Sequence, residues 1–211
     1  MSDISLILFD LNGVLYRYDR EARIAHLSFV SGCAPDAIRA AVWDSGFEDL
    51  GDAGAQDAEG YLRGFGACIG YDLPEADWVA AQQAAVTPIR DTMALLPSIR
   101  PAVAFAVLTN NNMLVARHFA DLYPEVAALV GERALVSAEF GVRKPDPEVY
   151  RRCLGRLGVA PGAALFVDDS AGNVIGARTA GLRGYEYTDP ESFAVELQRH
   201  GLLIQPGAQA S

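Results

Sequence analysis

Acidic side chains stand at two points of the chain where an apolar run ends. Asp10 follows the run Ile4–Phe9, and Asp168 and Asp169 follow the run Ala164–Val167. An acid placed directly after a buried strand can act as a nucleophile, a metal ligand or a helix cap. Two adjacent carboxylates repel one another, and a divalent cation with oxygen ligands relieves that repulsion. The pair therefore indicates a Mg²⁺ site.

Polar and basic side chains stand at two further points of this kind. Thr109 and Asn110 follow the run Val103–Leu108. A hydroxyl, an amide and helix-start N–H groups can cradle phosphate oxygens, although ordinary helix capping uses the same residue types. Lys144 precedes a helix start, where a lysine is usually a solvated surface charge. If it reaches the strand ends, its ammonium neutralises both a nucleophilic carboxylate and a bound phosphate.

The apolar runs before these residues are short and rich in β-branched and aromatic residues, which is typical of buried parallel strands. Further runs occur at Ala134–Val136 and Arg183–Tyr187. Helix starts are marked between them, for example by Asp146 followed by Pro147, and Gly158 ends that helix. Alternating strands and helices predict an α/β fold with a parallel sheet. Ligands bind outside the carboxyl ends of such strands, so we expect the four polar points to meet.

Residues 17–87 show a different pattern. Ile24, Leu27 and Val30 recur at helical spacing, and no convincing strand is present in this stretch. We interpret it as a helical insertion between the first strand and the rest of the sheet. The expected organisation is a sheet domain formed by residues 1–16 and 88–205, a helical domain at 17–87 and a flexible tail at 206–211.

Composition narrows the classes of partner. The 211 residues are 51% apolar and carry a net charge of −10, which describes a globular protein without the clustered Lys and Arg that nucleic acids and anionic membranes require. Three cysteines without metal-ligand spacing fit a reducing cytoplasm. The N-terminal apolar run is broken at Asp10, which argues against a signal peptide or a membrane span. We expect a cytoplasmic monomer or homodimer that binds a small molecule.

In their order and placement, the four stretches resemble the four motifs of haloacid dehalogenase-like hydrolases. They are Phe9-Asp10-Leu11-Asn12-Gly13-Val14, Leu108-Thr109-Asn110, Arg143-Lys144-Pro145 and Phe166-Val167-Asp168-Asp169-Ser170. The Lys-Pro-Asp-Pro and Asp-Asp patterns look most like small sugar-phosphate phosphatases and the phosphatase half of epoxide hydrolases. The resemblance implies a Rossmann-like parallel sheet flanked by helices, with a small helical cap inserted after the first strand.

The resemblance also implies an activity, a magnesium-dependent phosphatase that acts on a small phosphorylated metabolite such as a sugar phosphate. Asp10 would attack phosphorus and form an aspartyl-phosphate. The phosphate oxygens would be held by Thr109, Asn110 and Lys144. Mg²⁺ would be bound by the carboxylates of Asp10 and Asp169 and the backbone carbonyl of Asn12. Asp168 would be a ligand through water or an acceptor behind the ligands, and the adjacency of the two acids leaves that order open.

Asn12 departs from the family pattern, which usually places an Asp two residues after the nucleophile as general acid and base. An amide cannot deliver or remove a proton, and such catalysis is typically worth about 10²–10⁴-fold. Three functions fit this change. The favoured one is a phosphatase whose substrates have good leaving groups or whose proton relay uses water. The others are a 2-haloacid dehalogenase, which also lacks the second Asp, and a regulatory protein that binds a phosphorylated ligand.

Overall fold

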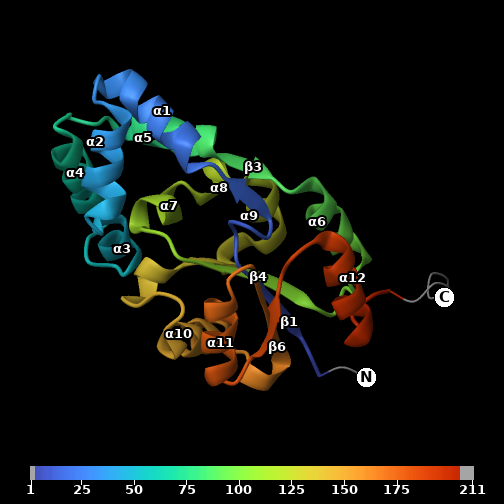
Figure 1. The fold of residues 1–211 in the computed structure, drawn as a ribbon. Helices are drawn as coiled ribbons and strands as arrows, with labels where there is room; N and C mark the ends of the chain where they lie inside the picture. Colours follow the sequence, from blue (N-terminus) through green and yellow to red (C-terminus); the bar gives the residue numbers. More distant parts are fainter. Residues whose placement is uncertain (1–2, 205–211) are drawn as a thin grey trace.

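The computed structural model describes residues 3–204, in which one five-stranded sheet is flanked by helices (Figure 1). The strands are β1 (Leu6–Phe9), β4 (Ala104–Thr109), β5 (Ala134–Val136), β6 (Ala164–Asp168) and β7 (Arg183–Glu186). They are parallel and lie in the order β5-β4-β1-β6-β7. The predicted α/β class with a parallel sheet is confirmed, and each predicted strand lies within two residues of its observed position.

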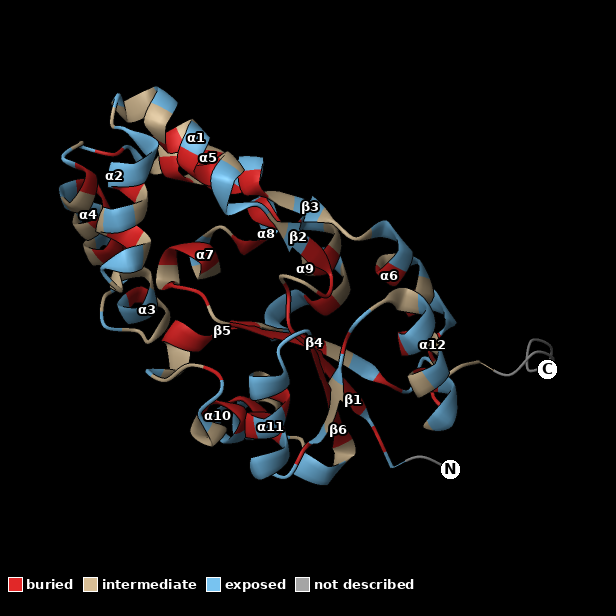
Figure 2. Ribbon diagram, in the orientation of Figure 1, coloured by how far each residue is buried: buried red, intermediate tan, exposed pale blue. Residues whose placement is uncertain are grey.

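Helices cover both faces of this sheet. Successive side chains of each strand point to opposite faces, so each strand contributes to two apolar clusters. On β1, Leu6 and Leu8 pack in the cluster that includes residues of α10 (Pro147–Leu157) and α11 (Ala171–Thr179). Ile7 and Phe9 pack in the larger cluster, which includes residues of α6, α9 and α12. Those three helices span Arg90–Leu95, Pro124–Val130 and Pro190–Arg199. The strands β1, β4, β5 and β6 are accordingly buried along most of their length (Figure 2), whereas β7, at the end of the strand order, has no buried residue.

The register of the sheet brings the predicted site residues to one level. Phe9 is paired with Val107 on β4 and with Val167 on β6. Asp10 therefore follows β1 at the level at which Asp168 ends β6, and β4 ends one residue beyond that level, at Thr109. The carboxyl ends of these adjacent strands form the edge at which ligands bind in open α/β sheets.

The chain between β1 and β4 contains the helical insertion, which lies on one side of the molecule away from both termini (Figure 1). Its helices are α1 (Arg20–Ser31), α2 (Pro35–Arg39), α3 (Phe47–Asp52), α4 (Ala58–Ile69) and α5 (Glu75–Ala85), and a π-helical turn spans Ala40–Asp44. We call residues 20–85 the helical insertion. The division of the chain into two domains stays a prediction.

The sequence-based expectation that residues 17–87 lack strands is wrong at both ends of the stretch. β2 (Tyr16–Tyr18) and β3 (Val86–Pro88) pair antiparallel where the chain leaves the sheet region and returns to it. Each strand has three residues, which is too short for an alternating pattern to be recognised in the sequence.

The remaining short elements complete the path of the chain. They are α7 (Met113–Arg117), α8 (Phe119–Leu122) and 3₁₀ turns at Leu96–Ser98, Gly131–Arg133, Ser137–Phe140 and Pro161–Ala163. None of the helices in residues 3–204 combines the length and the apolar character that crossing a bilayer requires. The predicted tail at 206–211 lies outside the described residues.

Candidate active site at the strand ends

A buried ion cluster occupies the carboxyl ends of β1 and β6. Nζ of Lys144 lies 2.8 Å from Oδ1 of Asp10 and 2.8 Å from Oδ2 of Asp168. The three residues are 2%, 8% and 0% exposed, respectively. Lys144 is thus not the solvated surface charge that its sequence context allowed, since its ammonium bridges the end of one strand and the residue after the other.

The charge states in this cluster follow from burial and from the neighbouring charges. Burial raises the pKa of Asp10 to about 6, and the ammonium of Lys144 opposes that rise. Burial lowers the pKa of Lys144, but the charges of Asp10 and Asp168 outweigh this effect and hold its pKa above the usual value. Lys144 is therefore a permanent cation, and Asp10 is a carboxylate at neutral pH that is only weakly solvated by water. Such a carboxylate is a good candidate nucleophile.

The two adjacent acids of the fourth motif have different surroundings. Besides the ion pair with Lys144, Asp168 accepts hydrogen bonds from the backbone N–H of Ser170 at 2.8 Å and from Nδ2 of Asn173 at 3.0 Å. The side chain of Asp169 is exposed, and within residues 3–204 its carboxyl has a hydrogen bond only with its own backbone. Its pKa is raised, first by burial of the carboxyl and then by the charge of Asp168. Asp168 is held by the protein, while Asp169 is free to bind a ligand.

The donor set at this edge fits a magnesium ion. One carboxylate oxygen from each of Asp10, Asp168 and Asp169 lies within 4.8 Å of the others. Oxygen-only donors with several negative charges are the ligands that Mg²⁺ prefers. Lys144 contacts Oδ1 of Asp10 and Oδ2 of Asp168, so the other oxygen of each carboxylate and both oxygens of Asp169 are not held by this cation.

The loop after Asp10 is shaped by Gly13. Its φ is +89°, and a Cβ built on it would lie 2.1 Å from Oδ2 of Asp169. Only glycine allows the backbone both this conformation and this close approach to the carboxylate. In the same loop, Oδ1 of Asn12 is buried without a hydrogen-bond partner in residues 3–204. A buried acceptor without a partner is costly and is found where a ligand completes the site.

The two residues that follow β4 have different roles in the structure. The hydroxyl oxygen of Thr109 accepts a hydrogen bond from Nδ2 of Asn111 at 2.9 Å, which leaves the hydroxyl hydrogen free for a phosphate oxygen. Both ends of the Asn110 amide are bonded to the backbone of Lys144, each at 2.9 Å. Asn110 therefore positions Lys144, and any contact it makes with phosphate would come from its backbone N–H.

A cleft of about 200 Å³ opens beside these loops, lined by Asn12 and Asn110 from the sheet edge and by residues of the helical insertion. Drug-sized ligands occupy cavities of roughly 300–1,000 Å³, so this cleft suits a smaller ligand. Among its lining residues are Arg23 on α1 and Asp52 at the end of α3. Sequence reasoning did not identify either residue.

Arg23 is the clearest of these missed residues. It is 2% exposed and pairs with Glu48 at 2.8 Å, and its guanidinium lies 5.3 Å from the ring centre of Trp43. A signal was present in the sequence, because Arg23 precedes Leu27 by four residues and so shares the apolar face of its helix. A charge on an apolar face is rare unless it is paired, and it is therefore worth testing as a functional residue.

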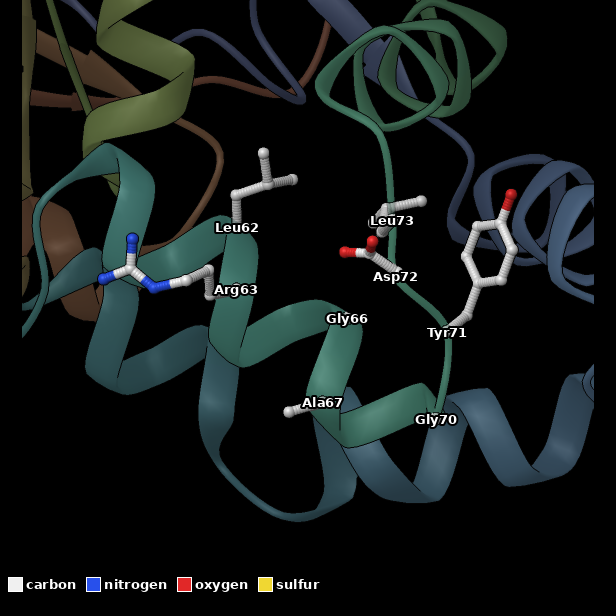
Figure 3. A pocket seen from close by; sticks show the side chains of 8 residues that line it. All are labelled: Leu62, Arg63, Gly66, Ala67, Gly70, Tyr71, Asp72 and Leu73. Atoms are coloured by element: carbon white, nitrogen blue, oxygen red, sulfur yellow. The ribbon is translucent and has the colours of Figure 1, made fainter.

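Another cavity, of about 380 Å³, lies on the helical insertion at the end of α4 (Figure 3). Leu62, Arg63, Tyr71 and Asp72 are among the side chains that line it. It contains none of the residues singled out in the sequence and no pairing of a nucleophile with a base. The strand-end cluster is therefore the candidate site.

The five-stranded parallel sheet with a carboxylate and lysine cluster at the carboxyl ends of its strands is an α/β fold with one candidate active site. Residues 4–181 match the haloacid dehalogenase-like hydrolase family. A phosphatase of Mycobacterium tuberculosis is 30% identical over 201 residues, which cover 86% of each chain. Hexitol phosphatase B of Escherichia coli is 31% identical over 116 residues, about half of either chain. The protein belongs to the haloacid dehalogenase-like hydrolases and is an enzyme.

Solved structures of this family share the fold. A family member from Bacteroides thetaiotaomicron, solved with magnesium and inorganic phosphate, aligns with a TM-score of 0.73 at 22% identity and covers 88% of this chain and 94% of its own. L-2-haloacid dehalogenase from Xanthobacter autotrophicus aligns with a TM-score of 0.61 at 19% identity, over 95% of this chain and 85% of its own. At these identities the alignments establish the fold.

Proposed function

We propose that this protein is a magnesium-dependent phosphatase that hydrolyses a small phosphorylated metabolite through an aspartyl-phosphate on Asp10. The observation that carries the proposal is the placement of Lys144 Nζ 2.8 Å from both Asp10 and Asp168, beside the unpaired carboxylate of Asp169. One fixed cation and one open acid next to a buried nucleophile are the elements that phosphoryl transfer requires. Phosphatase relatives, two of them similar over half of the chain or more, support the same reaction.

In the first step, the Asp10 oxygen that Lys144 does not hold attacks phosphorus, and the bond to the leaving oxygen breaks. Lys144 stays beside the nucleophile and neutralises charge on the transferring group, while Thr109 donates its hydroxyl to a phosphate oxygen. Asn110 keeps Lys144 in place through its two backbone bonds. In the second step, water hydrolyses the aspartyl-phosphate, which restores the Asp10 carboxylate and releases inorganic phosphate.

The metal would be held by Asp10, Asp169 and the backbone carbonyl of Asn12. Asp168, whose oxygens are already engaged by Lys144, Ser170 and Asn173, would support it from behind or through water. When bound, Mg²⁺ supplies charge neutralisation at the phosphate and fixes its orientation. Chelation is therefore expected to stop turnover.

The substrate class is inferred from the cleft. Its volume of about 200 Å³ suits a small leaving group, and its polar lining, which includes Asn111 and Gln82, favours one that carries hydroxyl groups. A sugar or sugar-alcohol phosphate has this size and chemistry. Hexitol phosphatase B, by its name, acts on such a compound.

The test is an assay of phosphate release from p-nitrophenyl phosphate and a panel of sugar phosphates, with Mg²⁺ and with EDTA. We expect metal-dependent release that disappears in Asp10→Ala, with an unchanged circular dichroism spectrum. Turnover that persists in Asp10→Ala would exclude Asp10 as the nucleophile. Chloride release from 2-chloropropionate without phosphate release would identify a dehalogenase, and a folded protein that binds Mg²⁺ but shows neither activity would point to a binding role.

A further inference from the structure

The cleft is lined by a carboxyl group, that of Asp52, which has no role in the two steps proposed above. Asp52 is the last residue of α3, and it lines the same cleft as Asn12 and Asn110. The cleft therefore joins the sheet edge that carries the nucleophile to an acid of the helical insertion. Because Asn12 cannot transfer a proton, the reaction needs another group in the cleft to protonate the leaving oxygen.

Three contacts fix the end of α3 against the strand-end loops. Oγ of Ser137 donates a hydrogen bond to the backbone carbonyl of Asp52 at 2.6 Å. Arg143, directly before Lys144, makes a two-pronged ion pair with Asp49 at 2.8 Å for each nitrogen. A Cβ on Gly54 would lie 2.4 Å from the carbonyl oxygen of Ala138, so the backbones touch here. Asp52 is thereby held in a fixed position relative to the site.

The neighbouring acids of α3 are engaged, and Asp52 is not. Glu48 accepts from Arg23 at 2.8 Å and from the hydroxyl of Tyr61 at 3.0 Å, and Asp49 is paired with Arg143. Within residues 3–204 the carboxyl of Asp52 has no hydrogen bond or ion pair. Its side chain is therefore available to a ligand in the cleft.

The surroundings of Asp52 keep it protonated near neutral pH. Burial is the largest cause that raises its pKa, the charges of Glu48 and Asp49 on its own helix raise it as well, and the net value is about 8. The cations that face it, Arg143 before α10 and Arg23 on α1, oppose this rise and do not cancel it. A position at the carboxyl end of a helix also disfavours a negative charge.

We propose that Asp52 is the general acid of this enzyme and replaces the acid that Asn12 lacks. As Asp10 bonds to phosphorus, the bond from phosphorus to the leaving oxygen breaks, and that oxygen takes the proton of the Asp52 carboxyl. The Asp52 carboxylate then takes a proton from the water that attacks the aspartyl-phosphate. The net reaction is a phosphate monoester plus water giving an alcohol plus inorganic phosphate. This inference rests on the proposed phosphatase activity.

The first test compares Asp52→Asn with wild type on two substrates, p-nitrophenyl phosphate and glycerol 3-phosphate. Nitrophenolate leaves without a proton, whereas an alkoxide does not. We expect kcat/KM to fall about 10²–10⁴-fold on glycerol 3-phosphate and less than about tenfold on p-nitrophenyl phosphate. Asp44→Asn, which removes an exposed carboxylate of the same insertion, is the control and should leave both unchanged.

An equal loss on both substrates, or no loss on either, would overturn the role of Asp52 as an acid. Activity on p-nitrophenyl phosphate also reports that Asp52→Asn is folded. If wild type releases no phosphate from any substrate, the proposed function itself fails. If wild type is active and Asp10→Ala is not, a negative result at Asp52 removes only this inference.

A second measurement needs no variant. For wild type, kcat/KM on glycerol 3-phosphate should decrease as the pH rises through about 8, because the acid loses its proton there. The same decrease in kcat/KM with rising pH should be absent for p-nitrophenyl phosphate. Alkaline limbs at the same pH for both substrates would assign the titration to another group and contradict the proposal.

Discussion

Asn12 and Asp52 line one cleft, and in the proposed reaction Asp52 supplies the proton that Asn12 cannot. An Asp at position 12 would place an acid next to the nucleophile, whereas Asp52 approaches from the helical insertion. When two positions can supply the same proton, the effects of their substitutions on the rate are not additive. A double-mutant cycle measures this dependence.

For Asn12→Asp alone we expect a gain of less than about tenfold on glycerol 3-phosphate, because Asp52 already provides the proton. In the Asp52→Asn background, the same substitution should restore about 10²-fold or more. Steady-state kinetics of the four proteins in the cycle test this. Equal gains in both backgrounds would mean that the two positions act independently and that Asp52 is not the missing acid.

Lys144 is the one cation that contacts both Asp10 and Asp168 in the described residues. Removing one partner of a buried ion cluster leaves uncompensated charge, which typically costs about 3–5 kcal/mol. We expect Lys144→Met to lower the free energy of unfolding by that amount in EDTA and to recover part of it with Mg²⁺, which binds only the folded site. Urea unfolding with and without the metal measures both effects.

Arg143→Met is the matched control for this substitution, because Arg143 precedes Lys144 and its ion pair with Asp49 is exposed to solvent. An exposed pair is worth about 1 kcal/mol or less. If the two variants lose equal stability, the interpretation of Lys144 as a structural cation of the site is wrong.

The helix α11 contacts the loop that carries Lys144 through a glycine. A Cβ on Gly176 would lie 2.0 Å from the carbonyl oxygen of Pro145, the residue after Lys144. Glycine inside a helix normally costs about 1 kcal/mol of stability relative to alanine. At position 176 this cost is offset because only glycine leaves room for the neighbouring backbone. The backbone of α11 therefore packs directly against the loop that carries Lys144.

We therefore expect Gly176→Ala to destabilise the protein by about 1–3 kcal/mol, the usual cost of overpacking, and to lower kcat. Gly155→Ala is the control, since Gly155 lies exposed in α10 with no atom within 4 Å of an added Cβ. It should be neutral or stabilising by up to about 1 kcal/mol. Thermal unfolding of both variants decides the matter, and a stabilised Gly176→Ala would refute the close approach.

At the scale of elements, the sheet was largely predictable because each buried strand is an apolar run that ends in a polar turn. The helix α10 was equally clear, since Asp146 accepts from the N–H of Glu148 at 2.8 Å and Gly158 ends the helix with a positive φ of +68°. The strands β2 and β3 were missed because three residues carry no period.

The candidate site was predictable only in part, for a physical reason. Asp10, Thr109, Asp168 and Asp169 lie at or directly after strand ends, and the rule for parallel sheets brings strand ends together. Lys144 lies in the loop before α10, and this rule does not place it. No such rule places the helical insertion against the sheet, because that placement depends on side-chain contacts between segments far apart in sequence. Asp52 and its tie to Ser137, 85 residues away, could therefore be found only in the structure.

At the scale of the whole molecule, the proposed chemistry divides between two parts of one chain. The sheet edge holds the nucleophile and the carboxylate cluster, and the insertion covers the cleft with Arg23 and Asp52. Contacts near the cleft, such as the pair of Arg143 with Asp49, connect the two parts beside the reacting groups. Substrate choice and proton transfer could therefore change in the insertion while the phosphoryl-transfer residues on the sheet stay the same.

A carboxyl group kept protonated for catalysis should be visible in the stability of the whole molecule. The pKa of Asp52 is raised to about 8 in the folded protein, and an unfolded Asp has a pKa of about 3.9. Between these values the folded state binds a proton that the unfolded state has released, so stability decreases as the pH rises through this window and levels off above about 8. Asp52→Asn removes this dependence.

We expect the stability of Asp52→Asn relative to wild type to rise by about 1–3 kcal/mol from pH 5 to pH 8, less than the full shift implies because the side chain is only partly buried. Urea unfolding in EDTA at both pH values measures this, with Asp44→Asn as the control that should follow wild type. A difference independent of pH would show that Asp52 is ionised in the folded protein, and a carboxylate could not then protonate the leaving group.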